Sequence, residues 1–496
     1  MNDGPSLPRN FDSFSLVNEA RALWDLSVPT IIIYLGFVVP SVLAASTIGR
    51  KFGHLELDGF SLASLSANVF QGTLLQGLFN ASDTLSPQAF GAGNYREVGL
   101  LAIRGFVSSM AIIVPVNLVL FLYMDDILIL LGQDAQASRY GWYFYMLYAT
   151  GFPFYCLFTI IWKFLSAQNI LLPLVISTLV STCIVLPVAM EVCVDQLGFM
   201  GAALAIAIFY MFQSLSVLIW IAFRKPHNPE TWPGLSAWKE AIAWGPFRNF
   251  LSLGIGGMLS YLEWIYFEAL SLMCGKIGVL SLSAHTIPTQ VIDLAFMFPL
   301  GLGVALSIRM GHTISQSVPQ TKLQAIGTMM FSVIVFGIGS ILMYIYQDAI
   351  IGIFTTETAV ENLCQSIWIH VCSYFFVLGV YGIVIGISLG LGMQWTLGVV
   401  TVVALWLFGL PAAYYFAMIR GGGLVAVWTC LWPPYVLING WMCMEFLTRD
   451  WTSISKAIRL REGLDEKDAT HTKIKAATSA LLDEDVDRNA PDYGTI

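Results

Sequence analysis

Two glutamates, Glu263 and Glu268, lie inside an apolar stretch that runs from Phe250 to Gly275. The stretch is long enough to cross a lipid bilayer, which takes about 20 residues as a helix. A carboxylate at the centre of a bilayer costs roughly 2.5–3.5 kcal/mol on insertion scales, so it is usually kept only where it has a function or a partner. This pair therefore gives the clearest indication of chemistry in the chain.

A buried carboxyl group has two possible uses. Desolvation disfavours its charged form, so it can exchange a proton near neutral pH. When ionised, the same group attracts a cation, so Glu263 or Glu268 could bind either a proton or a cationic solute. The alternative is a structural carboxylate that is hydrogen-bonded to neighbouring helices.

The spacing of the two acids predicts different surroundings for them. Five positions along a helix correspond to about 140° around its axis. Glu263 and Glu268 can face one narrow groove only if the helix unwinds, and glycines at 254, 256 and 257 would permit bending or close packing. We expect one acid to face a central cavity, beside the aromatic Trp264, and the other to face the interior of the C-terminal half.

The next apolar stretch adds Gln290 and Asp293, which lie one turn apart on one helix face. Asp293 is a further candidate for a buried acid that binds substrate or a proton. The alternative is a structural role for Asp293 as a partner of His285 or of another polar group.

Two polar positions lie near the N-terminal third of the chain. Asp83 ends the second apolar block, and Arg96, Arg104 or Lys163 could pair with it, so a structural or gating role is favoured over substrate binding. Asn68 is a neutral polar residue at membrane depth, and it could contact substrate or bridge helices.

Composition places the chain among membrane proteins. Of its 496 residues, 57% are hydrophobic and 11% are charged, against about 25% charged in a soluble protein. The apolar residues come in long blocks, which predicts an all-α membrane protein, since a membrane β-barrel shows short alternating segments. The formal net charge of −8 gives no indication of nucleic-acid binding, and the 8 cysteines are scattered without a CxxC pair, which favours neither a metal site nor disulfides.

Twelve apolar blocks divide the chain symmetrically. We expect a cytoplasmic N-terminal segment over 1–20, six spans over 21–223, a cytoplasmic loop over 224–247, six spans over 248–447 and a polar cytoplasmic tail over 448–496. Lys and Arg gather on the side that would carry both termini, and such residues accumulate on the cytoplasmic side of membrane proteins.

The two halves carry faint internal similarity. Three pairs of positions recur at nearly one offset: Gln168 and Gln394, Pro187 and Pro411, Gly198 and Gly421. A parallel repeat of six spans is a transporter architecture with the substrate site between the halves, although chance matches of common membrane residues are the alternative. The sequence shows no Walker motif, HExxH motif or nucleophile elbow, so we expect neither an enzyme nor an ATP-driven pump.

The motifs resemble those of the multidrug and toxic compound extrusion (MATE) family, most closely its eukaryotic branch. The resemblance covers about residues 20–447, and five motifs carry it: GHLELDGFSLA at 53–63, SDTLSPQAFGAGNYREVG at 82–99, KFLSAQNILLP at 163–173, LEWIYFEAL at 262–270 and GVALSIRMGH at 303–312.

The resemblance implies a secondary antiporter in which two six-helix lobes surround a central cavity and alternate their access to the two sides. It implies that Glu263 and Glu268 match acids important for transport, that Trp264 matches the adjacent aromatic residue, and that Asn68 matches a polar position of the second span. For Asp83, Gln88 and Arg309, which belong to the matched motifs, we expect gating or structural roles.

Two departures from the family pattern concern acids. An acid that eukaryotic members usually carry in the tenth span falls at about Leu378, and one that some animal members carry in the eighth span falls on Gln290. Asp293, three residues further on, could compensate. The motif that reads RVGN in relatives reads Arg309-Met-Gly-His here.

Taken together, these features predict a proton-coupled antiporter that exports small organic cations or other amphiphilic small molecules. We expect a monomer without cofactor or metal, in the plasma membrane or the membrane of an acidic organelle. Sodium coupling and the export of organic anions stay open, as does a membrane scaffold or receptor that has lost transport. A flippase for lipid carriers would favour a basic cavity, and the spans hold few Lys or Arg.

Overall fold

A computed structural model describes residues 16–355 and 357–464, and every element within those ranges is a helix. Up to residue 224 the elements are α1 (Leu16–Lys51), α2 (His54–Ala67), η2 (Asn68–Gly72), α3 (Thr73–Gly91), α4 (Tyr95–Leu130), α5 (Ala135–Tyr148), η3 (Ala149–Gly151), α6 (Phe152–Ser166), α7 (Leu172–Val180), η4 (Ser181–Val185), α8 (Leu186–Leu197) and α9 (Phe199–Arg224).

Three short elements connect this N-terminal half to the rest: η5 (Pro229–Thr231), η6 (Leu235–Ala237) and α10 (Trp238–Ala241). The C-terminal half comprises α11 (Trp244–Ile277), α12 (Val279–Ile314), α13 (Val318–Ile345), α14 (Gln347–Phe354), α15 (Thr358–Leu391), α16 (Gln394–Val402), η7 (Val403–Gly409), α17 (Leu410–Tyr414), η8 (Tyr415–Ile419), α18 (Gly423–Thr448) and α19 (Trp451–Arg461).

Ten helical segments of the described chain are long and apolar enough to cross a membrane, so the protein is a multi-pass membrane protein. Two further helical segments, 54–91 and 423–448, fall outside that set. The first of them carries Gln71, Gln76 and Asp83 along its length, which lowers its hydropathy.

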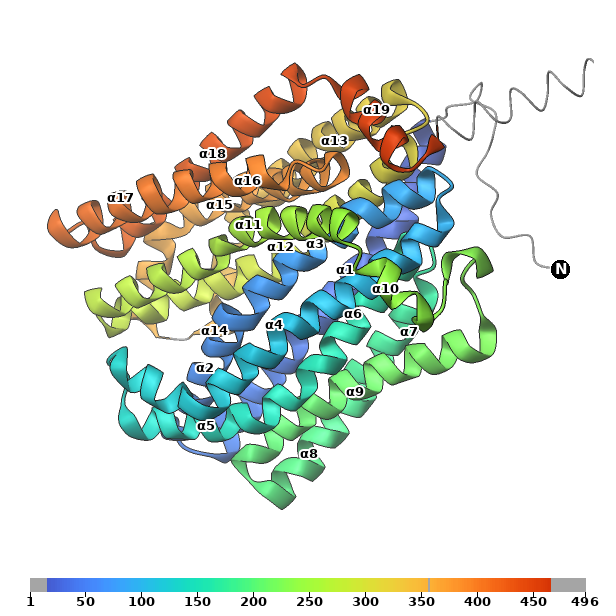
Figure 1. Cartoon of the computed structure of the whole chain (residues 1–496). Helices are drawn as coiled ribbons and strands as arrows, with labels where there is room; N and C mark the ends of the chain where they lie inside the picture. The colour runs from blue at the N-terminus through green and yellow to red at the C-terminus, as the bar shows by residue number, and fades with distance from the viewer. Residues whose placement is uncertain (1–15, 356, 465–496) are drawn as a thin grey trace, which may run out of the picture.

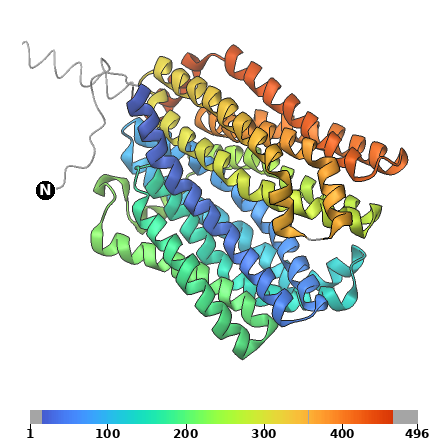
Figure 2. The same cartoon turned by 180° about the vertical axis from the view of Figure 1, so that it is seen from behind.

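The helices bury two large hydrophobic cores and one small cluster of Leu100, Ile103 and Ala241. One core is built mainly from residues of α1 to α9, and the other from residues of α11 to α19. α12 contributes to both cores, and it packs against α1 as well as α15. Figure 1 shows the two halves as two slabs of roughly parallel helices. Figure 2, which views the molecule from behind, shows α1 in dark blue beside α12.

The same local structure recurs at the positions that the internal similarity relates. A π-helical turn, η4 or η7, ends two residues before Pro187 or Pro411. Proline lacks an N–H group and crowds the preceding turn, and a wider π turn accommodates that loss. Each of these spans is then followed by a glycine at positive φ, Gly198 at 61° and Gly421 at 72°. The two halves therefore share local geometry as well as residue types.

The halves meet at the end of the molecule where α1 begins and where α10 and α19 lie, which we call the terminal face (Figure 1). Hydrogen bonds cross between the halves there. Thr84 Oγ1 donates to the Leu389 carbonyl at 2.7 Å, and Gln316 Nε2 donates to the Gly91 carbonyl at 2.7 Å. Deeper in the molecule, glycines let α3 and α11 approach closely, since a Cβ atom on Gly257 would lie 2.4 Å from the Gly77 carbonyl oxygen.

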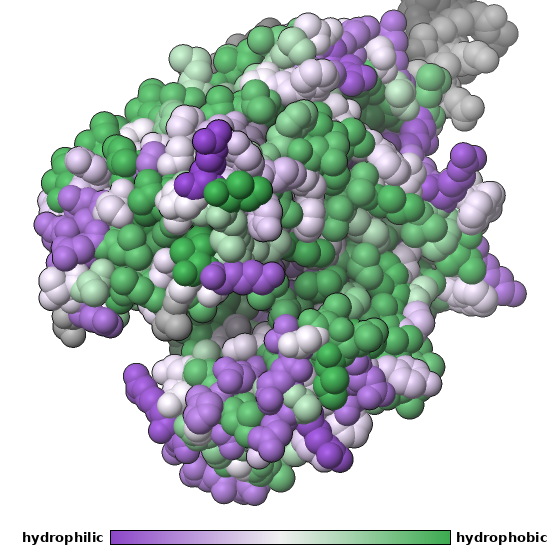
Figure 3. Space-filling view, turned by 90° about the vertical axis from the view of Figure 1, so that its left-hand side faces the viewer, coloured by the Kyte–Doolittle hydropathy of each residue, from purple (hydrophilic) through white to green (hydrophobic). Residues whose placement is uncertain are grey.

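At the opposite face the halves separate. Figure 3 looks onto that end and shows a hollow between the two halves. The hydrogen bonds that join the halves in the described residues involve side chains nearer the terminal face. The molecule is thus closed at the terminal face and open at the other.

α11 runs without a break through its three glycines and both acids. Local unwinding, which the sequence allowed at Gly254, Gly256 and Gly257, does not occur. These glycines serve close packing instead, because a Cβ atom at each would lie within 3 Å of atoms of α3 or α16. The two acids of α11 therefore point in different directions, as their spacing on an unbroken helix requires.

The contact between α12 and α15 gives a test of this packing. A Cβ atom on Gly303 would lie 2.2 Å from the Gly382 carbonyl oxygen, so Gly303→Ala forces two backbones apart and should cost about 1–3 kcal/mol. Gly327→Ala on α13 is the matched control, because nothing lies within 4 Å of its added methyl group. Thermal unfolding of the purified protein in detergent should show a lower midpoint for the first variant only; equal midpoints would contradict the close contact.

Candidate functional site

Glu263 lies inside the C-terminal half, with its side chain only 5% exposed. Tyr435 Oη of α18 donates a hydrogen bond to Glu263 Oε1 at 2.6 Å. The hydroxyl of Tyr381 on α15 lies near the same carboxyl group and 3.4 Å from Thr401 Oγ1. The rings of Tyr381 and Tyr435 have centroids 5.2 Å apart. A phenol can donate to a carboxylate or accept from a protonated carboxyl group, so this cage suits both protonation states.

A third tyrosine extends the cage. The ring of Tyr374 on α15 lies 5.2 Å from that of Tyr435 and 5.9 Å from that of Phe267. Its side chain is buried, and its hydroxyl has no hydrogen-bond partner among the described residues. Such a buried, unpaired hydroxyl calls for an unseen water molecule or a functional reason.

The other two acids face a different environment. Glu268 of α11 is half-buried, and Asp293 of α12 is exposed although protein surrounds it on most sides. The two carboxylates are close enough for their charges to repel each other. An accessible side chain that is surrounded by protein lies in a cleft rather than on an outer surface. Gln290, one turn before Asp293, is also exposed.

Trp264 and Asn68 lie apart from the tyrosine cage. Trp264 is exposed, and its ring packs against Tyr261 at 5.5 Å between centroids. Asn68 is exposed at the first position of the π-helical turn η2. The described structure therefore joins Glu263 to tyrosines and brings Glu268 near Asp293, and no hydrogen bond or ring contact of the described residues joins Trp264 or Asn68 to these acids.

Asp83 pairs with Lys163, one of the three basic residues that the sequence offered it. Lys163 Nζ lies 2.8 Å from Asp83 Oδ2, and both side chains are buried. The Lys163 ammonium also lies 4.1 Å from the Trp162 ring centroid. The helix that carries Asp83 continues beyond the apolar block to Gly91. Two polar residues of this last part, Thr84 and Gln88, donate hydrogen bonds to carbonyl groups of α15.

Gln88 and Arg309 lie at the closed terminal face. Gln88 Nε2 donates to the Gly390 carbonyl at 2.8 Å, and Gln88 Oε1 accepts from Arg461 Nη2 of α19 at 2.8 Å. Arg309 Nη2 donates to both carboxylate oxygens of Glu19 on α1, at 2.9 and 2.8 Å. Both residues thus join segments that are far apart in the sequence, which is where a gate would have to open.

Comparison with known proteins decides the family. The MatE family model matches residues 29–190 and 257–415, one segment in each half. The chain belongs to the MatE family.

Its relatives include multidrug and toxin extrusion proteins, so the chain is a transporter of that kind. It is 29% identical over 468 residues to "Multidrug and toxin extrusion protein 2" of Oryctolagus cuniculus, which covers 93% of this chain and 75% of that protein. It is also 29% identical over 422 residues to "Multidrug and toxin extrusion protein 1" of Rattus norvegicus, with 83% and 72% covered. The resemblance to the eukaryotic branch is therefore confirmed.

Solved structures of MATE transporters share the fold. The eukaryotic MATE transporter AtDTX14 superposes with a TM-score of 0.82 at 23% identity, over 90% of this chain and 99% of that one. The bent form of the Vibrio cholerae MATE transporter VcmN gives 0.73 at 16% identity, with 90% and 98% covered. At such low identity these matches establish the fold alone.

Leu378 stands at about the position where eukaryotic members are expected to carry an acid in the tenth span. Leu378 itself is buried in the core of the C-terminal half. The residues of α15 that approach Glu263 are Tyr374 and Tyr381, on either side of it in the sequence. Phenol groups thus surround Glu263 at the level where relatives are expected to carry a second carboxylate.

Sequence reasoning missed these tyrosines, although a signal was present. Tyr374 and Tyr381 are seven residues apart, which places them on one helix face. A tyrosine buried in an apolar helix usually needs a partner for its hydroxyl. Two such residues on one face indicate a polar partner on a neighbouring helix, but the sequence does not say which helix that is.

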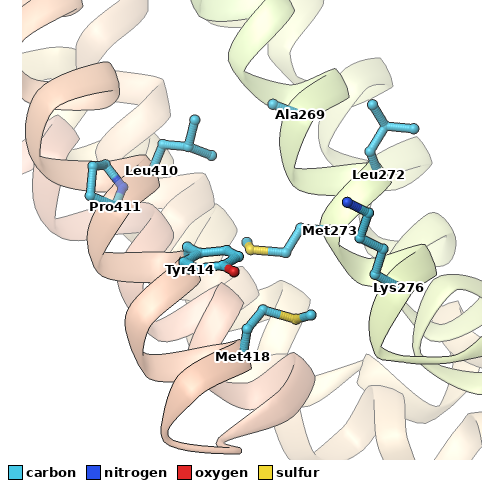
Figure 4. Close-up of a pocket in the computed structure, with 8 residues that line it drawn as sticks. All are labelled: Ala269, Leu272, Met273, Lys276, Leu410, Pro411, Tyr414 and Met418. Atoms are coloured by element: carbon cyan, nitrogen blue, oxygen red, sulfur yellow. The ribbon is translucent and has the colours of Figure 1, made fainter. Parts of the chain in front are cut away.

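A groove between α11 and the segment formed by α17 and η8 lies outside this cage. Its volume is about 380 Å³, and its lining is mainly apolar, with Met273, Leu410 and Tyr414 among the residues that face it (Figure 4). Lys276 is the one charged residue among those that line it. None of the sequence-predicted site residues lines this groove.

The Asp83–Lys163 pair makes a testable prediction. Lys163→Met leaves a buried carboxylate without its partner, which costs about 3–5 kcal/mol, whereas an apolar replacement of both partners is often tolerated. We expect the Asp83→Leu/Lys163→Met double variant to unfold at a higher temperature in detergent than Lys163→Met alone. Arg96→Met, which breaks an exposed ion pair with Glu240, is the control and should change little. A double variant no more stable than the single one would contradict a buried ion pair.

Proposed function

We propose that the protein is a secondary active antiporter that exports small organic compounds, cations foremost, in exchange for protons. The observation that carries this proposal is the surroundings of Glu263. Its carboxyl group is buried at membrane depth, and phenols rather than basic side chains contact it. A carboxyl group without a fixed positive partner is free to take its positive charge from a proton or from a cation.

Competition between these two ligands is sufficient for exchange. A proton on the carboxyl removes the negative charge that attracts an organic cation, and a bound cation disfavours protonation. Each ligand therefore lowers the affinity for the other by the same factor. In this proposal Glu263 carries the proton, Glu268 and Asp293 face the cleft, and Gln290, Trp264 and Asn68 contact the substrate.

Alternating access supplies the transport step. We propose twelve spans in two six-helix lobes, in which the segments 54–91 and 423–448 complete the ten spans identified by length and composition. The two separate cores support lobes that move as units. If both termini are cytoplasmic, as the distribution of Lys and Arg predicts, then the cleft in Figure 3 opens outward. The reverse state would require the contacts of Gln88 and Arg309 to break.

We further propose that the protein acts as a monomer without a bound cofactor, driven by the proton gradient of the plasma membrane or of an acidic organelle. The two halves of a single chain enclose the cleft, so a second copy of the protein is not needed to complete the site. Sodium as the driving ion is the alternative, because a carboxylate also binds Na⁺, and transport assays can separate the two.

Proteoliposomes test the proposal. With a panel of fluorescent organic cations and anions, an imposed pH gradient should drive exchange by the parent protein, and Glu263→Gln should reduce it by roughly a hundredfold, since the amide carries no exchangeable acidic proton. Glu230→Gln, on the exposed connection between the halves, is the control and should retain the parent rate.

Imposing a sodium gradient and a proton gradient in separate experiments identifies the ion that drives exchange. If exchange depends on the sodium gradient and not on pH, then sodium rather than the proton is the coupling ion. Exchange by Glu263→Gln at the parent rate would show that this carboxyl group does not couple the two fluxes.

A further inference from the structure

Three carboxyl groups lie in the central parts of the helices of the C-terminal half, and no Lys or Arg lies among them in the described chain. The charged residues in the central parts of α11, α12, α15 and α18 are Glu263, Glu268 and Asp293. The nearest basic residue along α11 is Lys276, eight positions beyond Glu268, which corresponds to about 12 Å along a helix. Glu268 and Asp293 are close enough to repel each other when both are charged, so a proton on one of them is favoured.

Contacts along α12 and α15 place Asp293 and Tyr374 at the same level. The two helices run in the same direction: Cys364 Sγ donates to the Ala284 carbonyl at 3.5 Å, and Gly382 packs against Pro299 further along. These contacts pair residues about 80 to 83 positions apart in the sequence, and Asp293 and Tyr374 differ by 81 positions.

Tyr374 therefore lies between the buried acid and the acids of the cleft. Its ring packs against Tyr435, whose hydroxyl holds Glu263. Its own hydroxyl is buried and close to the Tyr435 hydroxyl, without hydrogen-bond geometry to any group of the described chain. It also lies within the electrostatic influence of both Glu263 and Asp293.

We propose that Asp293 is a second proton carrier and that the Tyr374 hydroxyl links it to Glu263. The proposal rests on the proton coupling described above and adds the route by which the buried acid is reached. A protonated Asp293 passes its proton to Tyr374 Oη as the hydroxyl proton of Tyr374 moves to Tyr435 Oη. The hydroxyl proton of Tyr435 moves in turn to the Glu263 carboxylate. Both tyrosines end neutral, Asp293 ends ionised, and Glu263 ends protonated.

Other titratable groups surround Tyr374 and bear on the transfer of a proton from Asp293 to Glu263. Glu268 of α11 faces Asp293 and favours a proton on one of the two acids. Tyr381 shares α15 with Tyr374 and contacts Glu263, and Tyr266 of α11 adds a further phenol. Two histidines lie near Tyr374. His285 of α12 packs against Trp428, which also contacts the Tyr374 ring, and its Nε2 lies 3.2 Å from Ser271 Oγ. His370, one turn before Tyr374 on α15, has its Nε2 3.2 Å from Thr429 Oγ1. Neither Lys nor Arg lies in the central parts of α11, α12, α15 and α18 in the described chain.

Infrared spectroscopy after a pH jump tests the route without a transported substrate. The purified full chain in detergent is brought rapidly from high to low pH, and the absorption of protonated carboxyl groups is followed in time. Glu263→Gln and Asp293→Asn should each remove one band from the difference spectrum. Tyr374→Phe should retain both bands, because the hydroxyl passes the proton and does not bind it at equilibrium. The Glu263 band should appear roughly tenfold more slowly or slower still in this variant.

Matched variants control for structural effects. Tyr210→Phe changes a buried tyrosine of the N-terminal half, and Asp126→Asn changes an exposed acid of α4; both should leave bands and rates unchanged. Thermal unfolding shows whether each variant is folded, and Tyr374→Phe removes one oxygen atom only, so it should retain the packing of the ring.

The outcomes separate this inference from the proposed function. A Glu263 band that appears at the parent rate in Tyr374→Phe would overturn the link, and an unchanged spectrum in Asp293→Asn would overturn the second carrier. Either result leaves proton coupling through Glu263 intact if Glu263→Gln has lost exchange driven by a pH gradient. Retained exchange by Glu263→Gln would instead remove the proposed function itself, whatever the infrared bands show.

Discussion

The hydrogen bond between Tyr435 and Glu263 is the interaction on which the C-terminal half is organised. A carboxyl group in an apolar interior is costly when charged and still polar when neutral. Tyr435 and Tyr381 reach it from two different helices, so they satisfy it and also fix how α11, α15 and α18 pack around it. Because a hydroxyl both donates and accepts, this arrangement does not require the acid to remain in one protonation state.

The N-terminal half solves the same problem in the opposite way. Its buried acid, Asp83, has a basic partner in Lys163, and the aromatic ring of Trp162 covers the ammonium group. Removing either partner would leave the other buried without a counter-charge, so the pair stabilises one structure. The contrast between Asp83 with its lysine and Glu263 with its tyrosines points to a structural acid in one half and a chemical one in the other.

Contacts between the halves are concentrated where the molecule is closed. Glycines let α3 approach α11 and α12 closely, and side chains such as Gln88 and Arg309 add hydrogen bonds at the terminal face. α19 spans this seam, since Arg461 binds Gln88 of the N-terminal half and Ser455 Oγ donates to the Ile314 carbonyl of the C-terminal half. Beyond the seam the halves separate and leave a hollow at the opposite face (Figure 3).

The sequence by itself determined the class of the protein, since long apolar blocks fold as membrane helices and the few acids within them stand out against that background. It also determined that Glu263 and Glu268 point in different directions, because a helix of known pitch separates positions five apart. Only the tertiary structure decided that Glu263 meets Tyr435, that Asp83 meets Lys163 rather than Arg96 or Arg104, and that Leu378 is core while Tyr374 faces the acids. Helical periodicity is a local property and can be read along the chain, whereas the partner of a buried polar group depends on which helices lie side by side and at what depth.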